Sequence, residues 1–188
     1  MINYLKELDK KIFILIHHDG ENSFFNFIMP FVRDKYFWTP LYIVFLILIF
    51  YHFKKKSWII VFAVTLLITI TDQLSSSVFK PIFHRLRPCQ NSELSAYMNH
   101  VIDCGSGFGF VSSHAANHFA LAVFIGLLFY SRIKWLLFVL LAWAALVCYA
   151  QVYVGYHYPA DVICGGIVGT IPSVLLYRYL KKRLTKTN

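Results

Sequence analysis

Five apolar stretches of nearly membrane-spanning length constrain the fold of this sequence more than any other feature. A helix needs about 20 mostly apolar residues to cross a bilayer, and slightly fewer where aromatic and basic residues flank it. The stretches that approach this length are residues 37–53, 57–79, 115–130, 135–150 and 162–180. They predict an all-α integral membrane helical bundle with about five transmembrane helices.

Composition supports this fold class and removes one class of partner. The chain has 188 residues, of which 58% are hydrophobic, and it carries a formal net charge of +9. Basic residues gather at the ends of the apolar stretches, as in membrane proteins, so nucleic-acid binding is disfavoured. The first apolar run, residues 12–16, is too short for a cleavable signal peptide. We therefore expect one membrane domain, residues 1–188, with its transmembrane core at 37–180.

The basic residues also predict the orientation. If all five stretches span, three basic segments share one side: Lys54–Lys56, Arg132 with Lys134, and the tail from Arg178 to Lys186. Positively charged loops stay in the cytoplasm. The loop from Lys80 to His114 and the turn around His157 should then face outward, to the periplasm or the cell exterior.

Residues 1–36 form two shorter amphipathic patterns. Their apolar faces are Leu5, Leu8, Ile12, Leu15 and Ile16, and then Phe24, Phe27, Ile28 and Phe31. Neither pattern is long enough to span, and Pro30 disturbs the second. We expect two interfacial helices, placed on the outward side by an odd number of spans.

Ionisable residues beside the spans gather on the predicted outward side. They are Lys80, Arg87, His114, His157 and Asp161. Asp161 follows His157 by four residues, so its carboxylate can fix the imidazole tautomer. Fixed cations stabilise phosphoryl charge, while one histidine can attack phosphorus and the other can protonate the leaving oxygen. The pattern favours phosphoryl transfer without a metal or other cofactor.

This pattern resembles the type-2 phosphatidic acid phosphatase superfamily of membrane lipid phosphatases. The family motifs are K-x6-RP, PSGH and SR-x5-H-x3-D. The chain reads KPIFHRLRP at 80–88, VSSH at 111–114 and AQVYVGYHYPAD at 150–161. The resemblance covers about residues 55–180 and includes the order of the motifs.

The resemblance implies a role for each matching residue. His157 would be the nucleophile that forms a phosphohistidine, Asp161 its orienting partner, and His114 the general acid. Lys80, Arg87, Ser112 and the backbone near Ser113 would bind the phosphate. The implied activity is hydrolysis of a lipid phosphate or pyrophosphate at the outer face of a bacterial membrane. Candidate substrates are undecaprenyl pyrophosphate, lipid A phosphate, phosphatidylglycerol phosphate and phosphatidic acid; oligomeric state is not readable from the sequence.

Two positions depart from the family motifs. Ser113 replaces a glycine, and Gln151 stands where the family has a phosphate-binding arginine. Either Arg85 or His84 supplies the missing charge, or the site uses fewer cations, or catalysis is weak. A non-catalytic protein that binds or transports lipid phosphate is the alternative that Gln151 keeps open.

Three other groups of residues carry expectations. Cys89 and Cys104 share the outward loop, where a disulfide would contribute roughly 3 kcal/mol by loop entropy; the alternative is free thiols. His114 and His118 have a spacing that suits metal ligands, but no third ligand is near in sequence, so no metal site is predicted. Asp72, inside a span, is expected to pair with a neighbouring helix.

Overall fold

The computed structural model describes residues 2–99 and 101–185, and the regular structure within these ranges is helical, with no strand. The helices are α1 (Ile2–Ile14), α2 (Ser23–Arg33), α3 (Thr39–Phe53), α4 (Ser57–Gln73), α5 (Lys80–Phe83), α6 (Ser113–Phe129), α7 (Lys134–Tyr153) and α8 (Pro159–Thr185). A π-helical stretch, Leu74–Phe79, makes α4 and α5 one continuous rod. The predicted all-α bundle is confirmed.

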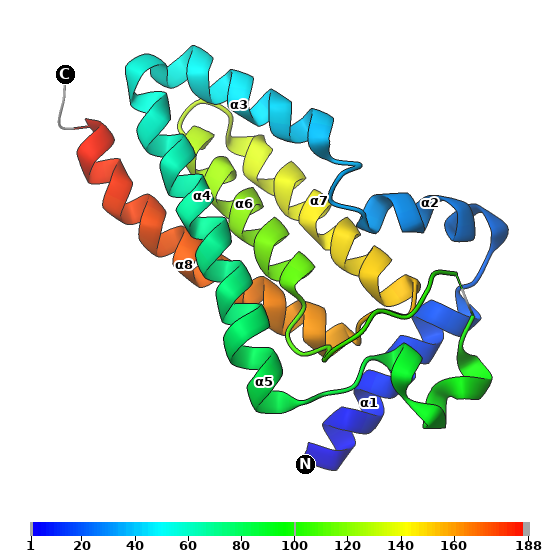
Figure 1. Cartoon of the computed structure of the whole chain (residues 1–188). Coiled ribbons are helices and arrows are strands. Elements are labelled where there is room, and N and C mark those ends of the chain that lie inside the picture. The colour runs from blue at the N-terminus through cyan, green and yellow to red at the C-terminus, as the bar shows by residue number, and fades with distance from the viewer. Residues whose placement is uncertain (1, 100, 186–188) are drawn as a thin grey trace.

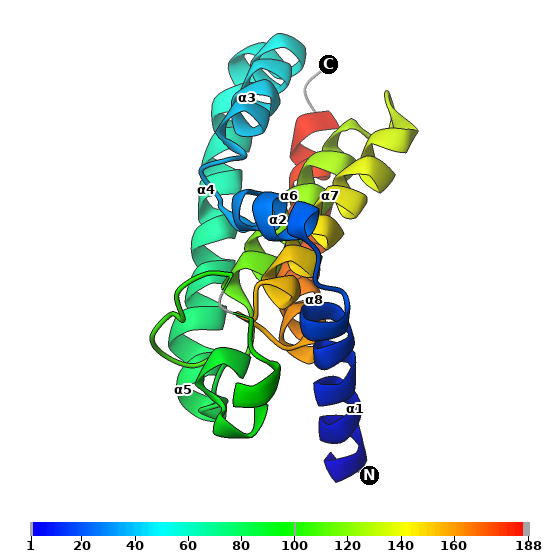
Figure 2. The ribbon, with the colours of Figure 1, turned by 90° about the vertical axis from the view of Figure 1, so that its right-hand side faces the viewer.

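Helices α3, α4, α6, α7 and α8 run side by side as the five apolar stretches predicted (Figure 1). The α3–α4 turn, the α6–α7 loop and the carboxyl end of α8 lie together at one end of the bundle. The long loop after α5, the α7–α8 turn and α1 lie at the opposite end, as Figure 2 also shows. The bundle therefore separates the basic segments from the chemistry-bearing loops.

Three helical segments of the described chain are long and apolar enough to cross a membrane: 39–97, Lys134–Tyr153 and Pro159–Lys182. The first contains both α3 and α4, which double back at the short 3-10 turn Lys54–Lys56. Helix α6, with 17 residues, is apolar but shorter. Its alanines at 115, 116, 120 and 122 are fully buried, because α4, α7 and α8 surround it. Its 17 residues are at the short end of the range for a transmembrane helix.

Helix α6 packs closely on α8, and this packing brings the amino ends of the two helices together. A Cβ atom at Gly165 would lie 2.5 Å from the Ser112 carbonyl oxygen, and one at Gly169 would lie 2.0 Å from that of Ala116. Small residues four apart let two helix backbones approach closely. The approach brings the start of α8 to the start of α6, where the Ser112 amide donates to the Asp161 carbonyl at 3.0 Å.

The two amino-terminal helices pack against the bundle with faces that the sequence pattern did not show. In α1 the buried residues are Asp9 and Phe13, whereas the predicted apolar face, including Leu5 and Leu15, is exposed. Helix α2 continues through Pro30, because Met29 and Val32 on either side of it pack against α7. Both helices thus present apolar side chains outward, as an interfacial helix requires.

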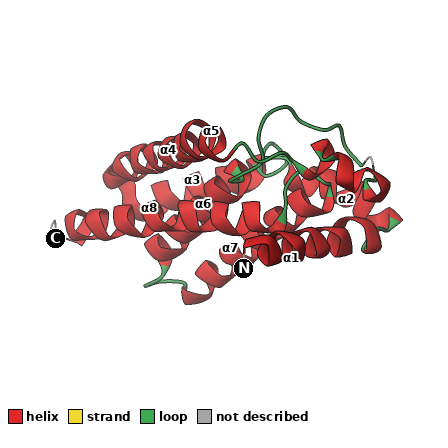
Figure 3. Ribbon diagram, turned by 90° about the horizontal axis from the view of Figure 1, so that it is seen from below, coloured by secondary structure: helices red, strands yellow, loops and turns green. Residues whose placement is uncertain are grey.

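The loop that joins α5 to α6 crosses the end of the bundle (Figure 3). A disulfide between Cys89 and Cys104 closes 15 residues of this loop, with the two Cα atoms 5.7 Å apart. The Gln90 side-chain amide donates to the Gly105 carbonyl at 3.0 Å. Together these links hold the segment that carries Arg87.

The disulfide gives the first testable prediction. In protein purified without reductant, Cys89 and Cys104 should resist alkylation after denaturation, because a bonded sulfur has no thiolate. Cys148 and Cys164, which are free, should label in the same sample. Peptide mapping by mass spectrometry reads all four sites, and labelling of both loop cysteines without reductant would refute the bond.

Candidate active site

The turn between α7 and α8 holds His157 in a fixed place. The Gln151 carbonyl accepts the amides of Tyr156 and His157 at 3.1 and 3.2 Å. Gly155 has φ of 79°, in the left-handed region that glycine adopts without strain. The imidazole that follows this tight turn is buried.

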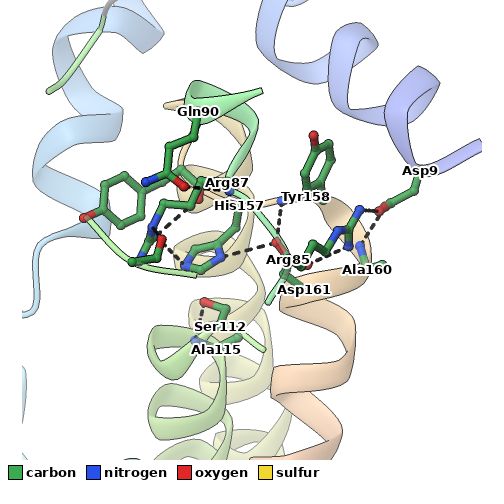
Figure 4. Close-up of polar contacts among 12 residues, drawn as sticks. Asp9, Arg85, Arg87, Gln90, Ser112, Ala115, His157, Tyr158, Ala160 and Asp161 are labelled. Carbon is green, nitrogen blue, oxygen red and sulfur yellow. Dashed lines mark hydrogen bonds and ion pairs between the residues drawn. The ribbon is translucent and has the colours of Figure 1, made fainter. Parts of the chain in front are cut away.

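Arg87 and Asp161 flank the two ring nitrogens of His157 (Figure 4). Arg87 Nη1 lies 3.4 Å from His157 Nε2, and Asp161 Oδ2 lies 3.5 Å from His157 Nδ1. A guanidinium can only donate, so Nε2 must present its lone pair and the proton resides on Nδ1. The 3.5 Å separation is longer than a hydrogen bond but within ion-pair distance, and catalytic hydrogen bonds often tighten once substrate binds. The geometry places the Nε2 lone pair beside the Arg87 guanidinium and Nδ1 beside the Asp161 carboxylate.

Burial lowers the pKa of His157, although the Asp161 carboxylate opposes this effect. The cations Arg87 and Lys80 act in the same direction as burial. A lowered pKa keeps the imidazole neutral, which is the nucleophilic form, at neutral and mildly acidic pH.

Asp161 is fully buried and is the centre of a chain of charged contacts. Its Oδ1 accepts from Arg85 Nη1 at 2.6 Å, and its Oδ2 accepts from the Tyr158 amide at 3.0 Å. Arg85 Nη2 in turn binds Asp9 Oδ2 at 2.5 Å, and Asp9 Oδ1 accepts the Ala160 amide at 2.8 Å. Helix α1 is thereby tied to the start of α8, and the carboxylate facing His157 is held from both sides.

This chain of contacts corrects the role expected for Arg85. Both of its terminal nitrogens are bound to carboxylates, and its guanidinium lies 4.0 Å from the centre of the Tyr158 ring. Two carboxylates for one guanidinium leave a net negative charge there. We infer that Arg85 positions Asp161 and is not available to bind phosphate. His84, the other candidate, is exposed and contacts the Phe108 ring.

The amino end of α6 supplies His114, Ser112 and Ser113. The Ser112 side chain caps this helix by accepting the Ala115 amide at 3.4 Å, and Ser113 Oγ accepts from Ser75 at 2.9 Å. Each hydroxyl accepts in these bonds and keeps its own O–H proton, which it can donate to an anion. The first amides of a helix have no intrahelical partner, so the backbone at 113 and 114 can add to the anion binding expected here.

Lys80 and His114 lie close enough to His157 for their charges to interact. Lys80 interacts with Arg87, Asp72 and Asp161, and the charge of His157 acts on His114. Asp72 accepts from the Asn117 side chain at 3.3 Å, so it pairs with α6 as the sequence predicted. The structure thus brings the side chains of all three motifs, except that of Gln151, to one end of the bundle around His157.

Gln151 is the motif position that the structure places differently. Its side chain is fully buried, and its Nε2 donates to the Arg33 carbonyl at 3.4 Å. Its Oε1 is a buried oxygen without a hydrogen-bond partner. The expected role as a phosphate ligand is not supported by this placement, because the amide faces the end of α2.

A cavity of about 750 Å³ leads from His114 along the bundle between α3, α4 and α6. Lys35, Ser113, His114 and Asn117 line its polar end. Phe45, Leu46, Ile49, Val61, Val64 and Ile68 are among its apolar lining residues. A polar head beside an apolar channel suits a lipid with a phosphorylated head group.

No group of three His, Cys, Asp or Glu side chains in the described chain is arranged to hold a metal ion. His118, whose spacing from His114 raised that question, contacts Tyr42 Oη at 3.3 Å and the His114 carbonyl at 2.8 Å. It is a structural histidine of α6.

Sequence reasoning missed Asp9 and Arg33, which both come from the amino-terminal helices. Asp9 reaches Arg85 and Ala160, while the Arg33 guanidinium lies 4.3 Å from the centre of the Tyr156 ring, next to His157. One signal was present for α1: Asp9, Phe13 and His17 recur every four residues, and all three are buried.

This chain is similar to a known protein family and to named relatives within it. A model of the PAP2 superfamily matches residues 57–185. A lipid A 4'-phosphatase of Bacteroides thetaiotaomicron is 34% identical over 98% of this chain and 82% of its own length. One from Porphyromonas gingivalis is 35% identical over 97% of this chain and 77% of its own length.

Two crystal structures share the fold. The first transmembrane PAP2 type phosphatidylglycerolphosphate phosphatase from Bacillus subtilis has a TM-score of 0.72 at 18% identity, covering all of this chain and 89% of that one. LpxE of Aquifex aeolicus has a TM-score of 0.71 at 24% identity, covering 92% of this chain and 96% of that one.

Proposed function

Because this chain belongs to the PAP2 superfamily and is a membrane lipid phosphatase, we propose that its substrate is lipid A and that it removes the 4'-phosphate. The observation that carries this proposal is the similarity to two lipid A 4'-phosphatases along almost the whole chain. The cavity between α3, α4 and α6 supports it, because a phosphorylated sugar with fatty acyl chains needs an apolar channel next to the phosphate site.

The proposed reaction has two steps. The lone pair of His157 Nε2 attacks phosphorus, the ester P–O bond breaks, and His114 gives its proton to the leaving oxygen. Water then attacks the phosphohistidine, His114 takes the water proton, and the N–P bond breaks to release phosphate. Lys80, Arg87 and the first amides of α6 hold the phosphoryl oxygens in both steps.

Asp161 acts on the nucleophile in this scheme. As phosphorus bonds to Nε2 the imidazole becomes cationic, and the carboxylate beside Nδ1 stabilises that charge. Arg85 and the Tyr158 amide keep the carboxylate in place throughout. These roles require no metal ion.

The site is proposed to face the periplasm. The three basic segments lie at the far end of the bundle, where the positive-inside rule favours the cytoplasm. A disulfide in the loop beside the site suits an oxidising compartment.

The test is phosphate release by the purified protein in detergent with EDTA present. We expect hydrolysis of lipid A that carries only the 4'-phosphate, and at most slow hydrolysis of lipid A that carries only the 1-phosphate. Undecaprenyl pyrophosphate, phosphatidylglycerol phosphate and phosphatidic acid complete the panel. Preference for one of these three would overturn the proposed substrate.

The same assay tests metal independence. Activity should be unchanged by EDTA, because the proposed steps use only protein groups and water. Loss of activity in EDTA, followed by recovery with zinc or magnesium, would contradict the mechanism while leaving the choice of lipid open to the panel. The non-catalytic alternative predicts no phosphate release from any lipid of the panel.

A further inference from the structure

Position 151 has a glutamine where the family motif has a phosphate-binding arginine, so a cation is missing from the motif. The Gln151 side chain ends beside the backbone of Arg33, with its Nε2 3.4 Å from the Arg33 carbonyl oxygen. A neutral amide with a buried, unpartnered oxygen cannot replace the lost charge. The neighbouring residue, Arg33, carries the positive charge that Gln151 lacks.

Arg33 ends α2 and turns its guanidinium toward the site. The guanidinium carbon lies 4.3 Å from the centre of the Tyr156 ring, and that of Arg87 lies 4.0 Å from the same centre. One aromatic ring, directly before His157, therefore carries two arginines. Arg33 Nε is a buried nitrogen without a hydrogen-bond partner.

The surroundings of Arg33 favour an anion. Burial lowers the pKa of Arg33, although the Tyr156 side chain and the Asp34 carboxylate act in the opposite direction. Arg87 is also buried. Two guanidinium groups that contact one ring repel each other, and an anion bound beside them would offset this repulsion. Arg33 and Lys35 also act electrostatically on His114, the proposed acid.

We propose that Arg33 is a phosphate-binding residue that replaces the charge absent at Gln151, so that the amino-terminal helix α2 completes the active site. The inference rests on the proposed function for its substrate but concerns the phosphoryl group, which every candidate lipid shares. Arg85 cannot take this role, because Asp9 and Asp161 bind both of its terminal nitrogens.

The test compares four proteins by two measurements. The proteins are the parent, Arg33→Met, Arg33→Lys and the double variant Arg33→Met with Gln151→Arg. Calorimetric binding of inorganic phosphate measures the anion site alone, and phosphate release from lipid A measures kcat and KM. Arg132→Gln is the matched control, because Arg132 lies 5.4 Å over the Phe53 ring at the far end of the bundle.

Arg33→Met should weaken phosphate binding and lower kcat/KM by about 10- to 100-fold, the range expected for a lost hydrogen bond to a charged group. Arg33→Lys should retain part of both, since charge remains without the planar fork. The double variant should recover part of the loss. The control should match the parent in both measurements.

A measurement on the parent avoids any variant that fails to fold. Inorganic phosphate should slow amide hydrogen exchange in residues 31–36 as well as in residues 84–90. Protection of 84–90 alone, or unchanged phosphate binding in a folded Arg33→Met protein, would overturn the inference. A parent that binds phosphate through Arg33 but hydrolyses no lipid would instead overturn the proposed function and leave this inference standing.

Discussion

Substitution of His157 by alanine is expected to lower kcat by about four orders of magnitude or more, because the nucleophile itself is removed. Binding of inorganic phosphate should survive. Lys80, Arg87 and the first turn of α6 stay in place, and the turn that carries His157 is held by backbone bonds from Gln151. Phosphate release and phosphate calorimetry on the same preparation separate the two effects.

A histidine at the opposite end of the bundle provides the control for this variant. His52, in the last turn of α3, contacts the Phe129 ring 5.4 Å away and lies outside the site. His52→Ala should retain the parent activity within about twofold, since surface substitutions away from special features have small effects. Residual activity of His157→Ala within tenfold of the parent would rule out the nucleophile assignment.

The bundle was predictable because its signals are local in sequence. Each apolar stretch predicts a membrane-spanning helix from its own length and composition, and the basic segments predict which helix ends lie on the same side. The structure shifts the ends by only a few residues: the expected 162–180 is α8, Pro159–Thr185. The site was predictable for a related reason. Its motifs begin or end helices, so spacing along the chain translates into position in space.

The residues that were missed depend on contacts between distant segments. Asp9 lies 151 residues before its partner Ala160, and 76 residues before Arg85. In a charged amphipathic helix, the sequence predicts that an aspartate is exposed to solvent. Only the packing of α1 against the site shows that Asp9 is buried. The exposed apolar side chains of α1 strengthened the prediction of exposure, since they describe its outer face and not its buried one.

The phosphate-binding role that we propose for Arg33 is the one that the sequence offered to Arg85. Arg85 was a candidate for the substitute cation, but the segment that carries it is held by the Gly109 amide, which donates to the Arg85 carbonyl at 2.7 Å. The two side chains then meet different partners: Arg85 meets Asp161, and Arg87 meets His157. Arg33 is 118 residues from Gln151, so no spacing rule could connect them.

Substitution of Asp161 by asparagine is expected to lower kcat by roughly three to four orders of magnitude, as when a catalytic histidine loses its orienting carboxylate. An amide keeps the shape but offers its NH2 group either to His157 Nδ1–H or to Arg85, and both of these groups are donors. The imidazole then loses the partner that fixes its tautomer and stabilises its positive charge. Phosphate binding, which relies on other residues, should change little.

Arg85→Ala should act through the same carboxylate but with the opposite effect on charge. Its removal leaves Asp9 and Asp161 without their shared cation. The site then becomes more negative, and the Asp161 carboxylate loses one of the groups that hold it in place. We expect kcat/KM to fall by about tenfold or more, less than for Asp161→Asn, because the carboxylate remains. A control variant is Lys11→Ala, on the exposed side of α1.

The pH profile of kcat/KM distinguishes positioning from a general loss of structure. Activity requires neutral His157, so the acid limb follows the pKa of that imidazole. The Asp161 carboxylate raises this pKa against the effect of burial, so Asp161→Asn should move the limb to lower pH. Arg85→Ala strengthens the negative field and favours imidazolium, so its limb should move to higher pH. Opposite shifts would establish that Arg85 tunes the carboxylate that serves His157; a silent Arg85→Ala, or shifts in the same direction, would show that Asp161 needs no such support.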